Sequence, residues 1–165
     1  MLLTVFLAIV FCAAMALMLI SAVAFIQDNK FFSSAPKEAR DVLIQRDKEL
    51  FYGARAIGWT LFIISILMVL GVGVTAVWDG FRSGFAFRQF FLRFVLIFTI
   101  YKLCDMVLID YFLLLKFKFF QHYYPEAEHV MEGKKYGFNI KSQLLKLLVI
   151  FPAASALAAW ICTLF

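Results

Sequence analysis

Long hydrophobic runs alternate with polar segments along the chain, and these runs set the predicted fold. The first run, residues 2–26, is 25 residues long and contains no Asp, Glu, Lys or Arg. Because about 20 apolar residues are enough for a helix to cross a bilayer, the run predicts a membrane-spanning helix. A cleaved signal peptide would have a basic start and a shorter apolar core, so we expect this helix to be retained.

Three more hydrophobic runs follow, and each predicts another membrane-spanning helix. They cover about residues 56–77, 94–115 and 147–165. The second and fourth runs carry small residues, which let membrane helices approach one another closely. The predicted fold class is an all-α integral membrane protein, in which residues 1–165 form a single transmembrane domain, a four-transmembrane-helix bundle.

The polar segment between the first two spans, residues 27–55, predicts an amphipathic cytoplasmic helix. Ser34 and Pro36 are typical of a helix start, with a hydroxyl cap and a proline in the first turn. Leu43 and Leu50 follow seven residues apart, a spacing that fits one face of a helix. We therefore expect helix from Ser34 to the end of the segment, with both leucines against lipid or the bundle.

Lys and Arg are unevenly distributed among the predicted loops. The short loop between the second and third spans is flanked only by Arg82, Arg88 and Arg93, and neither terminus carries a Lys or Arg. Loops 27–55 and 116–146 hold most of the others: Lys30, Lys37, Arg40, Arg46, Lys48, Arg55, Lys116, Lys118, Lys134, Lys135, Lys141 and Lys146. The positive-inside rule then predicts that both longer loops are cytoplasmic and both termini lie outside, in a plasma (inner) membrane.

The composition agrees with a membrane protein and excludes other classes. Of the 165 residues, 64% are hydrophobic, whereas a soluble domain has about 45–50%. This content excludes a disordered chain and a small disulfide scaffold. The net charge of +5 fits topological Lys and Arg, and no basic module indicates a nucleic-acid partner. Cys12, Cys104 and Cys162 lie in apolar runs without a CxxC motif, which disfavours a paired-cysteine redox enzyme.

The third predicted span carries ionisable residues in its interior, namely Lys102, Asp105 and Asp110. Lys102 and Asp105 are three residues apart, so one helix face holds both and they can form an ion pair. Tyr101, four residues before Asp105, could donate its hydroxyl to the carboxylate. Asp110 would lie about 140° further around an α-helix and would face a different neighbour.

Charges at this depth predict a polar site inside the bundle. An unpaired charge at mid-membrane costs at least about 2.5–3.5 kcal/mol, so this face should point away from lipid. Intramembrane ionisable residues typically mark substrate, ion or proton sites. The candidate ligand- or ion-binding residues are therefore Lys102, Asp105, Asp110 and Tyr101. The alternative is an internal ion pair that only fixes helix packing.

The loop after the third span holds a second group of chemically active side chains. His122, Glu126, Glu128, His129 and Glu132 fall within eleven residues. His and carboxylate are metal-ligand types, but no zinc-protease or EF-hand spacing appears. A solvated, charged loop is the favoured interpretation, with His122, His129 and Glu132 as weak metal candidates. The sequence identifies no catalytic residue and no cofactor.

Three functions stay open. The first is a small polytopic membrane protein that binds or translocates a small molecule, ion or lipid through the polar site on the third span. Four spans are few for a transporter, so a homo-oligomer is expected, with membrane lipids as further partners. The second is a membrane enzyme, and the third is a structural subunit of a larger membrane complex.

The second function is a membrane enzyme that acts on a lipophilic substrate at the cytoplasmic interface. Four helices, outward termini and a long cytoplasmic first loop resemble, in outline, the membrane-associated glutathione transferase family. The stretch VLIQRDKELFYGARAIGW, residues 42–59, lacks that family's pattern of Arg, Asn and Glu residues. No residue is therefore assigned a role from the resemblance.

Overall fold

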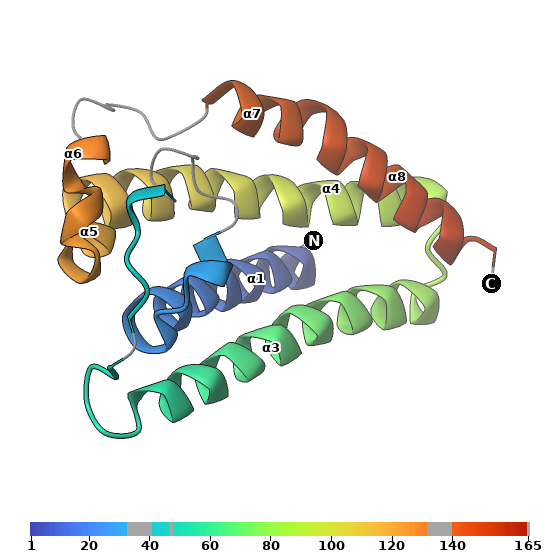
Figure 1. Ribbon diagram of the computed structural model, residues 1–165. Helices are drawn as coiled ribbons and strands as arrows, with labels where there is room; N and C mark the ends of the chain where they lie inside the picture. The colour runs from blue at the N-terminus through green and yellow to red at the C-terminus, as the bar shows by residue number, and fades with distance from the viewer. Residues whose placement is uncertain (33–40, 47, 132–139, 165) are drawn as a thin grey trace. The chain divides into compact units, whose positions relative to one another are not determined.

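The computed structural model describes residues 1–32, 41–46, 48–131 and 140–164, and this part of the chain is all-helical (Figure 1). It contains four long helices, some of which change helical type along their length. Their bounds are α1 Leu2–Ile20 with η1 Ser21–Ile26, α3 Ala54–Arg82, α4 Phe87–Cys104 with η3 Asp105–Lys116, and α7 Ile140–Leu145 with η5 Lys146–Ile150 and α8 Phe151–Cys162.

Short helices follow the first and third of these long helices. They are η2 Asn29–Phe32, α5 Phe119–Tyr123, η4 Pro125–Ala127 and α6 Glu128–Met131. Gln27 and Lys118, which come directly before these regions, have left-handed backbones with φ of 54° and 49°. The chain therefore changes direction sharply where each long helix ends.

Three of the long helices, counted over the described residues, are long and apolar enough to cross a membrane. They are Leu2–Ile26, Ala54–Arg82 and Gln143–Cys162. These helices indicate an integral membrane protein, as the hydrophobic runs predict. Helix α4 is not among the three, because its 18 residues include Arg88, Arg93 and Lys102.

The predicted spans and the observed helices differ mainly at their ends. The first span is confirmed at both ends by the helix over Leu2–Ile26. The third begins at Phe87 rather than near residue 94, because the Gln89 side chain accepts the backbone N–H of Ala86 at 2.8 Å and stabilises an earlier helix start. The fourth helical stretch also begins earlier, at Ile140.

The predicted amphipathic helix is wrong over the described residues 43–46 and 48–53, which are not helical. Backbone groups there bond to other segments of the chain. The Ile44 N–H donates to Glu126 Oε1 at 3.2 Å, and the Leu43 carbonyl accepts from Asn29 Nδ2 at 3.1 Å. These long-range bonds replace helical ones. The expected helix start at Ser34 and Pro36 lies outside the described residues.

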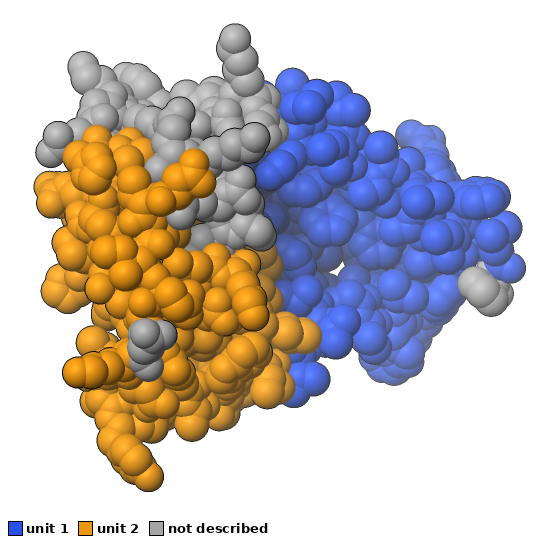
Figure 2. Space-filling view, viewed as in Figure 1, with its two compact units in different colours: residues 1–14, 67–105, 139–165 blue, residues 15–66, 106–138 orange. Residues whose placement is uncertain are grey.

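The chain forms two compact units, which are coloured in Figure 2. Unit 1 comprises residues 1–14, 67–105 and 139–165, and unit 2 comprises residues 15–66 and 106–138. Helices α1 and α3 and the continuous α4–η3 helix each contribute residues to both units.

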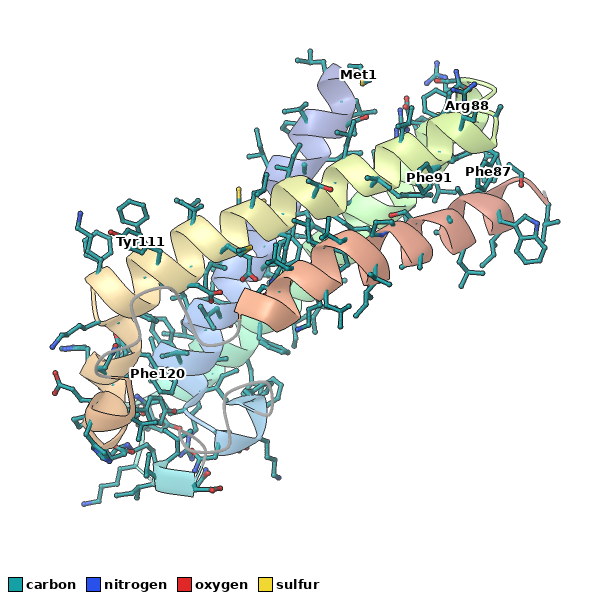
Figure 3. All side chains as sticks on the ribbon, turned by 90° about the horizontal axis from the view of Figure 1, so that it is seen from above. Met1, Phe87, Arg88, Phe91, Tyr111 and Phe120 are labelled. Atoms are coloured by element: carbon teal, nitrogen blue, oxygen red, sulfur yellow. The ribbon has the colours of Figure 1, made fainter. Side chains whose placement is uncertain are left out.

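The core of unit 1 is built from aromatic and small side chains. Phe90 is 1% exposed and packs directly against Gly80, where a Cβ atom would lie 2.2 Å from Phe90 Cε1. Phe87 and Phe91, labelled in Figure 3, stack one turn apart on α4 with an interplanar angle of 7°. The buried residues of this core are Leu7, Ala8, Val72, Ala76, Phe90, Phe94, Ile97, Ala159 and Cys162.

Unit 2 has its own core of Val23, Phe120, Tyr124 and Ala127. The rings of Phe120 and Tyr124 stack with their centroids 4.9 Å apart, and Tyr124 has no exposed surface. Elsewhere in this unit, a Cβ atom at Gly58 would lie 2.7 Å from Phe25 Cβ. Gly58 therefore allows α3 to approach η1 closely.

Candidate functional site

The predicted ion pair between Lys102 and Asp105 is formed inside unit 1. Lys102 Nζ donates to Asp105 Oδ2 at 2.5 Å, and the two side chains are 5% and 17% exposed. Lys102 lies in the last turn of α4, and Asp105 is the first residue of η3. The two charges therefore neutralise each other at a depth where neither is well solvated.

Aromatic rings from two other helices lie near Tyr101, the residue before Lys102. The Tyr101 ring meets Phe11 of α1 edge-on, with centroids 5.0 Å apart, and it lies 6.4 Å from Phe151 of α8. All of these residues belong to unit 1. Tyr101, the predicted supporting residue, thus lies on the part of α4 that packs against other helices.

The helix changes from α to π at Asp105. In a π-helix each N–H bonds to the carbonyl five residues earlier, as the Phe117 N–H does with the Phe112 carbonyl at 2.8 Å. The change of helical type therefore falls at the carboxylate of the ion pair.

Asp110 lies within η3 and is half-buried in unit 2. The expected rotation of about 140° from Asp105 assumed α-helical spacing, whereas this segment is π-helical. The structure therefore brings Lys102, Asp105 and Tyr101 into one unit and leaves Asp110 in the other.

Arg93 is a buried charge, although its place in the sequence indicated only one end of the third predicted span. Its side chain is 5% exposed, and its guanidinium donates to the Ala76 carbonyl at 2.8 Å and to Asp79 Oδ2 at 2.7 Å. The guanidinium carbon also lies 4.3 Å from the centroid of the Phe85 ring. One signal could have predicted this pairing, since Asp79 is the only acidic residue between Glu49 and Asp105.

A polar cluster in unit 2 connects the segment before α3 with the short helices that follow η3. Arg46 donates to Glu126 Oε2 at 2.7 Å, and its guanidinium carbon lies 5.6 Å from the Tyr124 ring centroid. Burial raises the pKa of the Tyr124 hydroxyl, while the positive charge of Arg46 acts in the opposite direction. The hydroxyl therefore stays protonated over the physiological pH range.

The weak metal candidates gain no support from the part of the chain that the structure describes. Within it, no three His, Cys, Asp or Glu side chains lie close enough together to hold a metal ion. Glu126 pairs with Arg46, and Glu128 pairs with Lys118 at 2.7 Å. His122 and His129 are exposed, and Glu132 lies outside the described residues.

Comparison of the chain with protein-family models, with curated proteins and with solved structures found no match.

Proposed function

We propose that this chain is a small polytopic membrane protein that binds or translocates a small molecule, ion or lipid at a polar site formed by Lys102 and Asp105. One observation carries the proposal: a buried acid–base pair lies in the interior of a long helix, at the change from α to π. Charges at such a position are costly to keep in a membrane, and their default interpretation is functional.

The difference in burial between the two side chains suggests how the site acts. Asp105 is 17% exposed and Lys102 only 5%, so the carboxylate is the more accessible partner. A cation or a hydrogen-bond donor that reaches Asp105 competes with the Lys102 ammonium for the same oxygen atoms. Binding and release of a ligand then correspond to breaking and re-forming the ion pair.

The proposal includes four membrane spans, with the α4–η3 helix as the third, in a plasma (inner) membrane. Both termini lie outside, and loops 27–55 and 116–146 are cytoplasmic. The distribution of Lys and Arg supports this topology.

Two other functions are each favoured by a specific observation. A membrane enzyme acting at the cytoplasmic interface is favoured by the cluster in unit 2 of half-buried Arg46 and Glu126 with buried Tyr124. A structural subunit of a larger membrane complex, or of a homo-oligomer, is favoured by the mutual neutralisation of Lys102 and Asp105. Membrane lipids are partners in every case.

The test is flux through the purified protein in liposomes. Separate preparations carry a pH-sensitive dye for protons, a sodium- or potassium-sensitive dye, or a fluorescent phospholipid that reports exchange between leaflets. We expect the wild-type protein to carry one of these, Asp105→Asn to abolish the signal, and Arg88→Gln to leave it unchanged because Arg88 is exposed on the same helix. Wild-type protein indistinguishable from empty liposomes for every probe would refute translocation, and a folded Asp105→Asn variant with wild-type flux would refute the role of the Lys102–Asp105 site.

A further inference from the structure

Cys12 and Cys104 lie far apart in the sequence but meet within unit 1. Cys12 is on α1, and Cys104 is the last residue of α4. The two thiols share a side-chain hydrogen bond, and both cysteines are half-buried rather than fully enclosed in the core. Two helices therefore bring two sulfur atoms together at a place that is partly accessible.

Aromatic packing joins the same two helices at the level of the thiols. Phe11, the residue before Cys12, meets the Tyr101 ring edge-on with centroids 5.0 Å apart, and its centroid is 6.1 Å from that of Phe98. Tyr101 precedes Cys104 by three residues, so the two share a face of α4. The thiol pair thus belongs to a packed contact between α1 and α4.

Two neighbouring thiols select soft metal ions. Sulfur is the ligand that Cu⁺ prefers, and this monovalent ion can be held by two sulfur atoms alone. Zinc almost always takes four ligands in a structural site. Within the described residues, no three His, Cys, Asp or Glu side chains lie close enough together to hold a metal ion. The pair therefore fits a two-coordinate Cu⁺ ion and does not fit zinc.

The charges around the thiols permit a bound cation. A monovalent cation that replaces one thiol proton leaves the net charge of the site unchanged, which matters because a charge buried in apolar surroundings is costly. The Asp105 carboxylate acts electrostatically on Cys12. Lys102 balances that carboxylate, so the neighbouring ion pair adds no net positive charge that would repel the cation.

We propose that Cys12 and Cys104 form a binding site for Cu⁺, held between their two sulfur atoms. Binding releases one proton, so that one sulfur coordinates as a thiolate and the other through a lone pair of its thiol. The site goes beyond the ion pair of the proposed function and does not use Asp105 as a ligand. A bound ion would connect α1 to α4 within unit 1.

Competition with the chelator bicinchoninate tests this site. Reduced, purified protein in detergent is titrated without oxygen into the coloured Cu⁺–bicinchoninate complex, and the loss of absorbance gives the amount of ion bound. We expect the wild-type chain to take up one Cu⁺, and Cys12→Ser and Cys104→Ser each to bind it at least tenfold more weakly. Cys162→Ser is the matched control, because Cys162 is the third cysteine of the chain and lies on α8 of the same unit.

The outcomes separate a metal site from two cysteines that merely pack together. A wild-type chain that leaves the coloured complex intact would overturn the proposal. Binding by Cys162→Ser that is no stronger than that of the other two variants would overturn it as well.

X-ray absorption at the copper edge of the loaded wild-type protein keeps the test valid if a serine variant does not fold. We expect two sulfur neighbours, and coordination by nitrogen or oxygen would contradict the site. Because both readouts report metal binding, a negative result leaves the flux through the Lys102–Asp105 site untouched.

Discussion

The coupling between Lys102 and Asp105 can be measured by replacing each residue alone and both together. The changes are Lys102→Met, Asp105→Asn, and the double replacement of both residues by Met. Each single change leaves one buried charge without its partner, whereas the double change removes both charges. We expect each single variant to be less stable than the double variant.

The burial of the pair sets the expected size of the effect. Breaking a buried ion pair costs about 3–5 kcal/mol, and the 17% exposure of Asp105 places this pair at the lower end, about 3 kcal/mol. For a chain of this length that corresponds to a loss of roughly 6–12 °C in Tm. Asp105→Asn should cost more than Lys102→Met, because it leaves the more deeply buried charge alone. The double variant should lie within about 1 kcal/mol of the wild type.

Thermal unfolding in detergent micelles, followed by tryptophan fluorescence, measures these differences. The flux assay on the same samples then separates two roles for the pair. A double variant that is stable but inactive indicates a binding site, and one that is stable and active indicates a packing device. Single-variant losses that simply add up in the double variant would show that the two side chains are not coupled, and the reasoning would be wrong.

Three further predictions concern other parts of the chain. Gly80→Ala should lower the Tm by an amount equivalent to about 1–3 kcal/mol, because the new Cβ would meet the Phe90 ring at 2.2 Å. The control Gly71→Ala should not lower the Tm, because a Cβ there meets open space. Lys118→Met should raise the pKa of Glu128, which the Lys118 hydrogen bond holds below its ordinary value, and a carboxyl NMR titration would detect this. Since that pKa is lowered in the folded protein, the stabilisation from Glu128 should be present at neutral pH and lost as the pH falls through the folded-state pKa. In acid unfolding, Lys118→Met should therefore lose less stability than the wild type as the pH falls.

The sequence predicted the long helices well, because hydrophobic run length is a local property. The run of residues 2–26 matches the observed helix at both ends. The segment after it was predicted wrongly because its conformation depends on distant partners. Ile44 and Arg46 both bond to Glu126, 80 or more residues away, and no periodicity within residues 27–55 contains that information.

The candidate site shows the same limit. The spacing of Lys102 and Asp105 was enough to predict their pairing, because residues three apart share a helix face. The π-helical register that begins at Asp105 could not be derived from that spacing, and the orientation expected for Asp110 was based on α-helical geometry. Arg93 was missed because an arginine near the end of a span can either extend to the surface or turn inward. Its partners across the turn, Asp79 and Ala76, decide between the two.

The pairing of charges on α4 also bears on whether this helix can be the third of the four proposed spans. By composition α4 is too charged, since it carries Arg88, Arg93 and Lys102. In the structure, however, Arg93 is neutralised by Asp79 and Lys102 by Asp105, so two of the three charges have a partner of opposite sign. A neutral, hydrogen-bonded pair costs far less to place in a membrane than two separate charges. Arg88 is exposed one residue after the start of the helix, where a long basic side chain can reach the interface. A count of charged residues therefore overestimates the cost of placing α4 in a membrane, because two of its three charges are paired.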